Sequence, residues 1–323
     1  MYEGQKVIDV HGHMTTPAKF RGFAMNLITI RSPQNRFEMS DEELDRALGE
    51  HIAALDTRNI DVQLLSPRPV AMFHWESPHI QEQWCRVTND VLAQSVRLHP
   101  DRFGGICQLP QSREFDTNNC LDELERSITE LGMVGALINP DPSGERDVPG
   151  VDDKYWYPLY EKAQELDAPL LLHPSASKDP RVRRIPHNYQ INNVWEEYLA
   201  TLLYIATDVF KDFPRLKVVI CHGGGALSRH FDSDIRDGHP ARRDIQERFK
   251  DNLFFDTCVY DRDFMRTMLA HKGVDAAVFG TEIGAALRTD VVEIIDSVPD
   301  LTTEDKIKIF NTNPRRVYSR LKA

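Results

Sequence analysis

Short, continuous apolar runs alternate along the chain with longer segments in which apolar residues recur at helical spacing. The apolar runs lie at residues 6–13, 62–68, 103–110, 134–140, 169–175, 216–224, 252–260 and 276–282. Continuous runs of this length are typical of parallel strands covered on both faces, whereas half-exposed strands alternate apolar and polar residues. We therefore expect eight parallel strands.

The segments between these runs are expected to be helices. Residues 40–55 place Ser40 and Glu43 in a capping-box arrangement and then place leucines on one helical face. A second helix is expected to end at Gly132, because glycine favours the left-handed conformation that closes many helices. Further helices are expected at 155–168, at 195–213 and from 301 onward. Eight strand–helix units predict an α/β fold, a (β/α)8 TIM barrel that forms a single domain over residues 1–323.

The composition narrows the class of protein. Hydrophobic residues make up 41% of the chain and charged residues 28%, as in an ordinary soluble globular protein. The net charge of −11 argues against partners that carry phosphate, so we expect neither nucleic acid nor an anionic membrane surface as a partner. The five cysteines are scattered and form no C-x-x-C pair. This usage predicts a cytoplasmic location without disulfide bonds.

Histidines and a carboxylate stand where several of the expected strands end. These residues are His11 and His13 in the first run, His173 in the fifth, His222 in the sixth and Glu282 in the eighth. In (β/α)8 barrels the active site lies at the carboxyl ends of the strands. His11 and His13 are two residues apart and therefore point to the same side of their strand. Two buried imidazoles in contact need a common ligand, and a divalent metal ion is the obvious one.

Each of these residues also has a simpler explanation when it is taken alone. His173 fits a core histidine bonded to the backbone, and Glu282 fits a helix cap. His222 precedes three glycines, a pattern that also occurs in esterase oxyanion holes, but the sequence has no G-x-S-x-G nucleophile motif. Taken together, His11, His13, His173 and Glu282 form a ligand set for one divalent ion, with Zn2+ expected first and Mn2+ as the alternative. The remaining histidines considered, which are His51, His99, His239 and His271, are expected to be solvated.

Basic and polar residues near the strand ends are candidates for binding a small carboxylate substrate. Arg68 follows the second run and Asn139 ends the fourth. The loop after the fifth run is long and basic, and in an acidic protein such a loop suggests recognition of carboxylates. For any single residue of the loop, a solvated surface position is an equally good explanation. The candidates in and beyond this loop are Arg183, His187, Tyr189, Arg229 and Arg288.

The motifs together resemble a known family. The H-G-H of the first run, His173-Pro174, the HGGG that begins at His222 and the acid at 282 resemble the amidohydrolase-related group that contains α-amino-β-carboxymuconate-semialdehyde decarboxylase and the resorcylate and carboxyvanillate decarboxylases. The stretches DVHGHMTTPAK, NPDPSG, WYPLYEK, FKDFPRLKVVICHGGGA and FFDTCVYD are more similar to 4-oxalomesaconate hydratases. The decarboxylases generally have a metal-binding aspartate at the end of strand eight, whereas Glu282 resembles the glutamate of the hydratases. The extra methylene extends the reach of the carboxylate, so Glu282 either binds the metal or stands off it and transfers protons, and the sequence leaves both roles open. The arginine-rich loop after the fifth run departs from the hydratase pattern, which leaves the exact substrate open.

The resemblance implies a metal-dependent lyase of aromatic-acid catabolism that adds water to an unsaturated oxo-polycarboxylate, with His222 and Glu282 as the catalytic residues. One of them activates water and the other protonates carbon, and burial, which raises the pKa of a carboxyl group, favours Glu282 as the acid. Arginines such as Arg68 and Arg229 are expected to hold the substrate carboxylates. The alternatives are non-oxidative decarboxylation of a hydroxylated aromatic or muconate-type acid and hydrolysis of a small lactone or amide. The resemblance also implies a homodimer or a higher homo-oligomer.

Overall fold

A computed structural model describes residues 1–31, 36–185, 189–226, 250–259, 261–283 and 288–323. Its eight strands are β1 (Ile8–His13), β2 (Val62–Ser66), β3 (Phe103–Cys107), β4 (Gly135–Ile138), β5 (Leu170–Leu172), β6 (Val218–Ile220), β7 (Leu253–Asp256) and β8 (Ala277–Val278). Each pairs in parallel with the next in sequence order. The ring closes where Val10 N donates to Phe279 O and Gly12 pairs in parallel with Ile283. The predicted (β/α)8 barrel is therefore confirmed.

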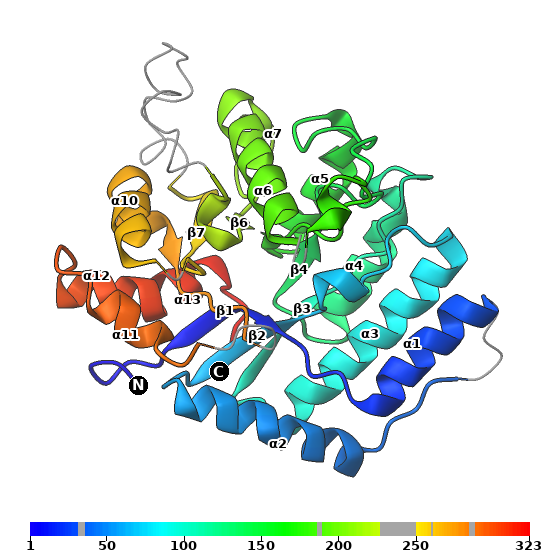
Figure 1. Ribbon diagram of the computed structural model, residues 1–323, viewed down its shortest axis with the longest axis horizontal. Helices are drawn as coiled ribbons and strands as arrows, with labels where there is room; N and C mark the ends of the chain where they lie inside the picture. The colour runs from blue at the N-terminus through cyan, green and yellow to red at the C-terminus, as the bar shows by residue number, and fades with distance from the viewer. Residues whose placement is uncertain (32–35, 186–188, 227–249, 260, 284–287) are drawn as a thin grey trace.

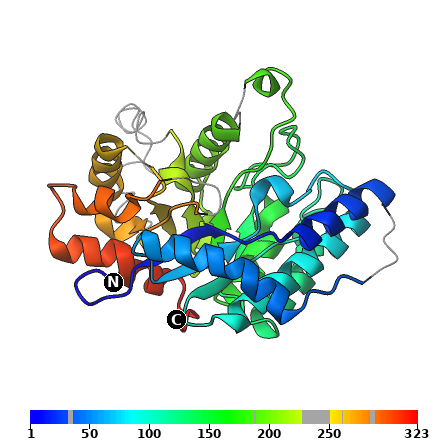
Figure 2. The same cartoon turned by 60° about the horizontal axis from the view of Figure 1, so that its bottom comes forward.

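Helices surround this sheet on the outside (Figure 1). They are α1 (Ala18–Ile30), α2 (Asp41–Thr57), α3 (Pro78–Leu98), α4 (Leu121–Thr129), α5 (Tyr157–Glu165), α6 (Tyr189–Ala206), α7 (Val209–Asp212), α10 (Arg262–Lys272), α11 (Val291–Asp296), α12 (Thr303–Ile307) and α13 (Asn313–Val317). The turn from Figure 1 to Figure 2 brings α2 to the front and leaves the marked N and C termini on the same side of the barrel. No helix in the described part of the chain combines the length and apolar character needed to cross a membrane.

Apolar side chains fall into two separate clusters, as a closed barrel requires. Alternate strand residues, among them Val10, Leu64, Leu171 and Val219, form one cluster with Tyr318 and its neighbours near the C-terminus. Because this cluster draws on all eight strands, it fills the barrel interior. The intervening strand residues pack outward with the helices in the larger cluster. Both faces of each strand are therefore buried, which explains why the strands appear in the sequence as continuous apolar runs.

The helix boundaries differ most from the predictions at two places. The helix expected at 195–213 begins earlier, at Tyr189, and is broken after Ala206 into α6 and α7. The helix expected to end at Gly132 ends at Thr129, and Gly132 then takes φ 71° while Met133 N donates to Ser127 O. Gly132 therefore supplies the left-handed residue of the closing turn, as expected, although it lies beyond the last helical residue. At the start of α2, Ser40 accepts the predicted hydrogen bond from Glu43 N at 3.2 Å.

Candidate active site

A β-bulge aims the two histidines of β1 at the barrel axis. Asp9 pairs with Gln63 and Gly12 with Leu65, so β1 has one residue more than β2 between these two pairs. The glycine between the histidines is required by packing, because a Cβ atom at Gly12 would lie 2.0 Å from Cδ of Gln63. The bulge and this glycine place the imidazoles of His11 and His13 together, with ring centroids 5.2 Å apart.

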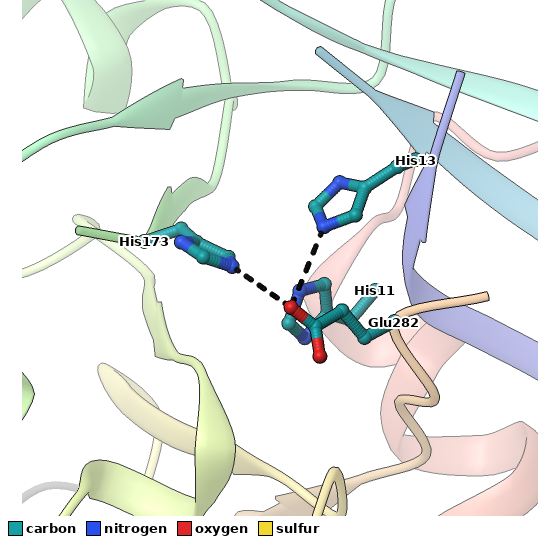
Figure 3. Close-up of side chains that lie close together, drawn as sticks. All are labelled: His11, His13, His173 and Glu282. Carbon is teal, nitrogen blue, oxygen red and sulfur yellow. Dashed lines mark ion pairs between the residues drawn. The ribbon is translucent and has the colours of Figure 1, made fainter. Parts of the chain in front are cut away.

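Four residues converge at the carboxyl ends of the strands, as predicted. His11, His13, His173 and Glu282 each offer one ligand atom, and these atoms lie within 4.8 Å of one another. Oε1 of Glu282 lies 3.9 Å from Nε2 of His13 and 3.9 Å from Nε2 of His173 (Figure 3). These distances are too long for hydrogen bonds. They match ligands that share an ion, since two atoms each about 2.1 Å from a metal are at most about 4.2 Å apart.

Every histidine of the cluster is held through its Nδ1 atom. His11 Nδ1 lies 2.6 Å from Asp256, His13 Nδ1 3.0 Å from Ser66 Oγ, and His173 Nδ1 2.6 Å from Pro174 O. Within the described residues, the buried Nε2 atoms of His11, His173 and His222 have no hydrogen-bond partner. Metal-binding histidines show this arrangement, in which one ring nitrogen is fixed by the protein and the other faces the ion. The donor set therefore fits one divalent ion.

Burial lowers the pKa of two of the histidines. It lowers the pKa of His13 to about 4 and that of His173 well below its usual range. A metal binds the neutral form of imidazole, so these rings are ready to act as ligands at neutral pH.

His222 differs from the other three histidines because it sits between two carboxylates. Its Nδ1 lies 2.6 Å from the fully buried Glu197, and its Nε2 lies 3.6 Å from Oε1 of Glu282. Burial acts against the charged imidazole, but the two carboxylates outweigh it and raise the pKa of His222 well above its usual value. The surroundings of His222 therefore favour its protonated form.

Glu282 shows the opposite shift from the one expected. Burial by itself favours the neutral acid, but the imidazoles of His13 and His222 lower the pKa of Glu282 well below its usual range. The prediction that burial makes Glu282 the acid is thus wrong, because the surrounding histidines outweigh desolvation.

His222 and Glu282 both have left-handed backbone conformations. His222 has φ 47° and Glu282 has φ 56°, values that cost a non-glycine residue about 1–2 kcal/mol. After His222 the chain turns through Gly223, with φ 63°, where a Cβ atom would lie 2.7 Å from Sδ of Met268. The glycines after His222 therefore form a tight turn, as expected, and strain of this kind is concentrated at functional sites.

The predicted substrate-binding residues have different outcomes. Arg68 is half-buried after β2, and its charge interacts with that of Glu282. Asn139 is buried and points into the protein, where Nδ2 donates to His74 and Oδ1 accepts from Asp141 N. Arg288 is partly exposed and forms an ion pair with Asp290. His187 and Arg229 lie outside the described residues. The backbone of Arg183 lies in the short 3-10 turn at residues 182–184, and that of Tyr189 lies at the start of α6.

The structure also shows residues that the sequence analysis missed. Asp256 and Ser66 end strands β7 and β2, so the strand-end argument that found the histidines applies to them as well. Glu197 lies within α6, and no local pattern distinguishes it from its neighbours. His51, expected to be solvated, is 9% exposed and lies 2.6 Å from Gln63. That expectation is wrong because α2 turns this histidine toward the strands.

A closed eight-stranded barrel with three histidines and a carboxylate converging at its active end defines the class of metal-dependent (β/α)8-barrel enzymes. Within that class the chain belongs to the amidohydrolase family, whose sequence model matches residues 8–320.

Similar proteins include both hydratases and decarboxylases. The 2-keto-4-carboxy-3-hexenedioate hydratase of Sphingobium sp. (strain NBRC 103272 / SYK-6) is 32% identical over 98% of this chain and 97% of its own. The 4-oxalomesaconate hydratase of Rhodopseudomonas palustris, known from a crystal structure, has 31% sequence identity to this chain. Its structure matches with a TM-score of 0.86 and covers 98% of this chain and 96% of the hydratase chain. The gamma-resorcylate decarboxylase of Rhodococcus jostii (strain RHA1) is 27% identical over 82% of this chain and 85% of its own.

Proposed function

We propose that this protein is a metal-dependent lyase that adds water to the carbon–carbon double bond of an unsaturated oxo-polycarboxylate such as 4-oxalomesaconate. The observation that carries the proposal is the placement of Glu282, whose Oε1 lies among the Nε2 atoms of His13, His173 and His222. Two hydratases related over nearly the whole chain support the same reaction.

The metal would be held by His11, His13, His173 and Glu282. A divalent ion supplies Lewis acidity there, which makes water more acidic at neutral pH. Zn2+ and Mn2+ both accept such a mixed set of nitrogen and oxygen donors. The Nδ1 partners Asp256 and Ser66 keep His11 and His13 oriented toward the centre.

Glu282 and His222 would divide the proton transfers. The ionised Glu282 accepts the proton that water loses as its oxygen adds to the carbon conjugated with the carbonyl. The Nε2–H of His222 donates a proton to the carbon next to the carbonyl, while Glu197 holds the ring through Nδ1. After the reaction Glu282 carries a proton and His222 lacks one, and their separation of 3.6 Å lets the proton return through a small movement.

Arg68 would stabilise negative charge in this reaction. It lies after β2, and its charge interacts with that of Glu282, which places it near the Glu282 side of the cluster. A guanidinium can hold a carboxylate or an enolate oxygen through two parallel hydrogen bonds.

Non-oxidative decarboxylation is the second candidate, because a gamma-resorcylate decarboxylase is 27% identical over most of the chain. The same metal and the same proton donor would serve that reaction, but it consumes no water. Product mass therefore separates the two functions.

The test is to incubate the purified protein with 4-oxalomesaconate, with and without a chelator, and to measure the mass of the product. Gain of one water that is abolished by chelation is the expected result, and loss of carbon dioxide would overturn the hydratase proposal. Glu282→Gln should lower kcat by at least about a hundredfold, because the amide cannot accept the proton from water. Glu42→Gln, an exposed change in α2, is the matched control and should leave kcat unchanged.

A further inference from the structure

A cavity of about 590 Å³ adjoins the metal cluster on the side of α1 and α2. Met14 and Ile283, which line it, directly follow the ligands His13 and Glu282 in the chain. Arg68 also lines the cavity. The cavity therefore lies beside the edge of the cluster that His13 and Glu282 form, and it is lined by the same Arg68 whose charge interacts with that of Glu282.

Three arginines from different elements line this cavity. They are Arg21 of α1, Arg46 of α2 and Arg68 after β2. Burial and the neighbouring Arg21 both lower the pKa of Arg68, so the two positive charges are close enough to repel each other. Like charges brought together in this way favour binding of an anion between them.

Arg21 and Arg46 also lack the ion pairs that other arginines of the protein form. Within the described residues, no hydrogen bond or ion pair engages either guanidinium, whereas Arg97 pairs with Asp41 at 2.6 Å and Arg102 with Asp56 at 2.7 Å. Two glutamates also line the cavity. One of them, Glu43, lies 3.5 Å from Lys19 and is partly neutralised, so Glu50 is the main acidic residue beside Arg21 and Arg46.

The inner wall of the cavity is fixed by a chain of hydrogen bonds. Thr15 and His51 line the cavity, and Thr15 Oγ1 lies 2.8 Å from His51 Nδ1. His51 Nε2 lies 2.6 Å from Gln63 Oε1, and Gln63 Nε2 donates to Asp9 at 2.7 Å. Burial and the nearby charge of Arg68 lower the pKa of His51 and so favour its neutral form, in which Nε2 donates to the amide oxygen and Nδ1 accepts from the threonine. The positive charge of the cavity therefore comes from its arginines.

We propose that Arg21 and Arg46, together with Arg68, form a carboxylate subsite that binds the carboxyl groups of the substrate remote from the reacting double bond and makes the enzyme selective for tricarboxylates over dicarboxylates. This inference rests on the proposed function. The related hydratase is named for a hexenedioate with an additional 4-carboxy group, which is a tricarboxylate. Arg68 holds the carboxylate next to the metal, and the exposed Arg21 and Arg46 hold the far one at the mouth of the cavity.

The test measures binding without turnover, by titration calorimetry on the metal-loaded protein. The probes are propane-1,2,3-tricarboxylate and pentanedioate, which differ in one carboxylate and have no double bond to hydrate. The wild-type protein should bind the tricarboxylate at least about tenfold more tightly. Arg21→Gln and Arg46→Gln should each weaken its binding about threefold, and the double variant about tenfold, with little change for pentanedioate. Arg97→Gln, an exposed arginine on α3, is the matched control and should leave both affinities unchanged.

Equal affinity of the wild-type protein for both probes, or equal losses in Arg97→Gln and the double variant, would overturn the subsite. Kinetics with 4-oxalomesaconate then separate this inference from the proposed function. If water is added but the double variant keeps the wild-type KM, the subsite fails and the reaction stands. If no water is added but the double variant loses selectivity between the probes, the reaction fails and the subsite stands.

Discussion

The two ends of the barrel interior are built from the same strands but differ in chemistry. On β5, Leu171 packs in the apolar interior cluster, and two residues later His173 points from the same face into the metal cluster. The apolar end is filled by closely packed side chains that need no specific partner. The polar end depends on individual pairs, such as His11 with Asp256 and His222 with Glu197, and includes two residues in left-handed conformations. The contrast indicates that stability comes mainly from the first end and that the second end is arranged for chemistry.

The strongest way to test this comparison is to replace His173 with alanine. We expect kcat to fall at least about a thousandfold and bound metal to be lost, because the variant lacks one of the four side chains proposed to hold the metal. The melting temperature of the metal-free protein should fall less than in Leu171→Ala, because burying a polar ring without metal carries a desolvation cost, and the hydrogen bond that the ring loses is the one from Nδ1 to Pro174 O. Metal analysis and the product assay measure the first effect, and calorimetry of the metal-free protein measures the second. A fully active variant would exclude His173 as a ligand.

The matched change at the other end is Leu171→Ala, two residues earlier on the same face of the strand. Leu171 is fully buried, so removing its side chain should lower the free energy of unfolding by about 2–5 kcal/mol. Metal content and kcat per folded molecule should remain near the wild-type values. Denaturant titration and the product assay together provide the measurement. If activity falls as steeply as in His173→Ala, the two ends are not separable.

Lys272 provides a further test of the difference between the two ends, because it is a buried lysine that contacts the turn after His222. Its Nζ donates to Gly223 O in the turn after His222 and lies 4.1 Å from the centre of the Phe255 ring. Burial lowers the pKa of Lys272 to about 7, although Asp256 and Glu197 oppose this shift. An unfolded lysine titrates near 10.5, so between these values the unfolded chain binds the proton more tightly than the folded chain does.

The free energy of unfolding should therefore rise with pH across this window, by at most about 1.4 kcal/mol per pH unit. Lys272→Met should lose this rise, because methionine carries no proton to release. Denaturant titrations of both proteins at several values between pH 7 and 10 measure the difference in slope. If the free energy of unfolding varies with pH in the same way in both proteins, the pKa of Lys272 is not lowered by folding.

Strand positions were predictable because their physical cause is local in the sequence. A parallel strand covered on both faces needs a continuous apolar run, and each of the eight runs contains a strand. The convergence of His11, His13, His173 and Glu282 was predictable for the same reason, since barrel topology places strand ends together wherever the strands occur in the chain. Glu197 was not predictable, because its partner His222 lies 25 residues away and its own helix shows no special pattern. The position of His51 depends likewise on the packing of α2 against Gln63.

The sequence by itself determined the number of strands, their parallel order and the residues that meet at their ends. The tertiary structure decided which atom of each residue faces the centre, because Nδ1 partners come from distant segments. Asp256, the partner of His11, is 245 positions away from it in the sequence. It also decided the charge of Glu282, since local reasoning about burial predicted a neutral acid and the surrounding imidazoles reverse that shift. The physical reason is range: apolar periodicity is fixed by neighbours along the chain, whereas electrostatics and hydrogen bonding depend on neighbours in space.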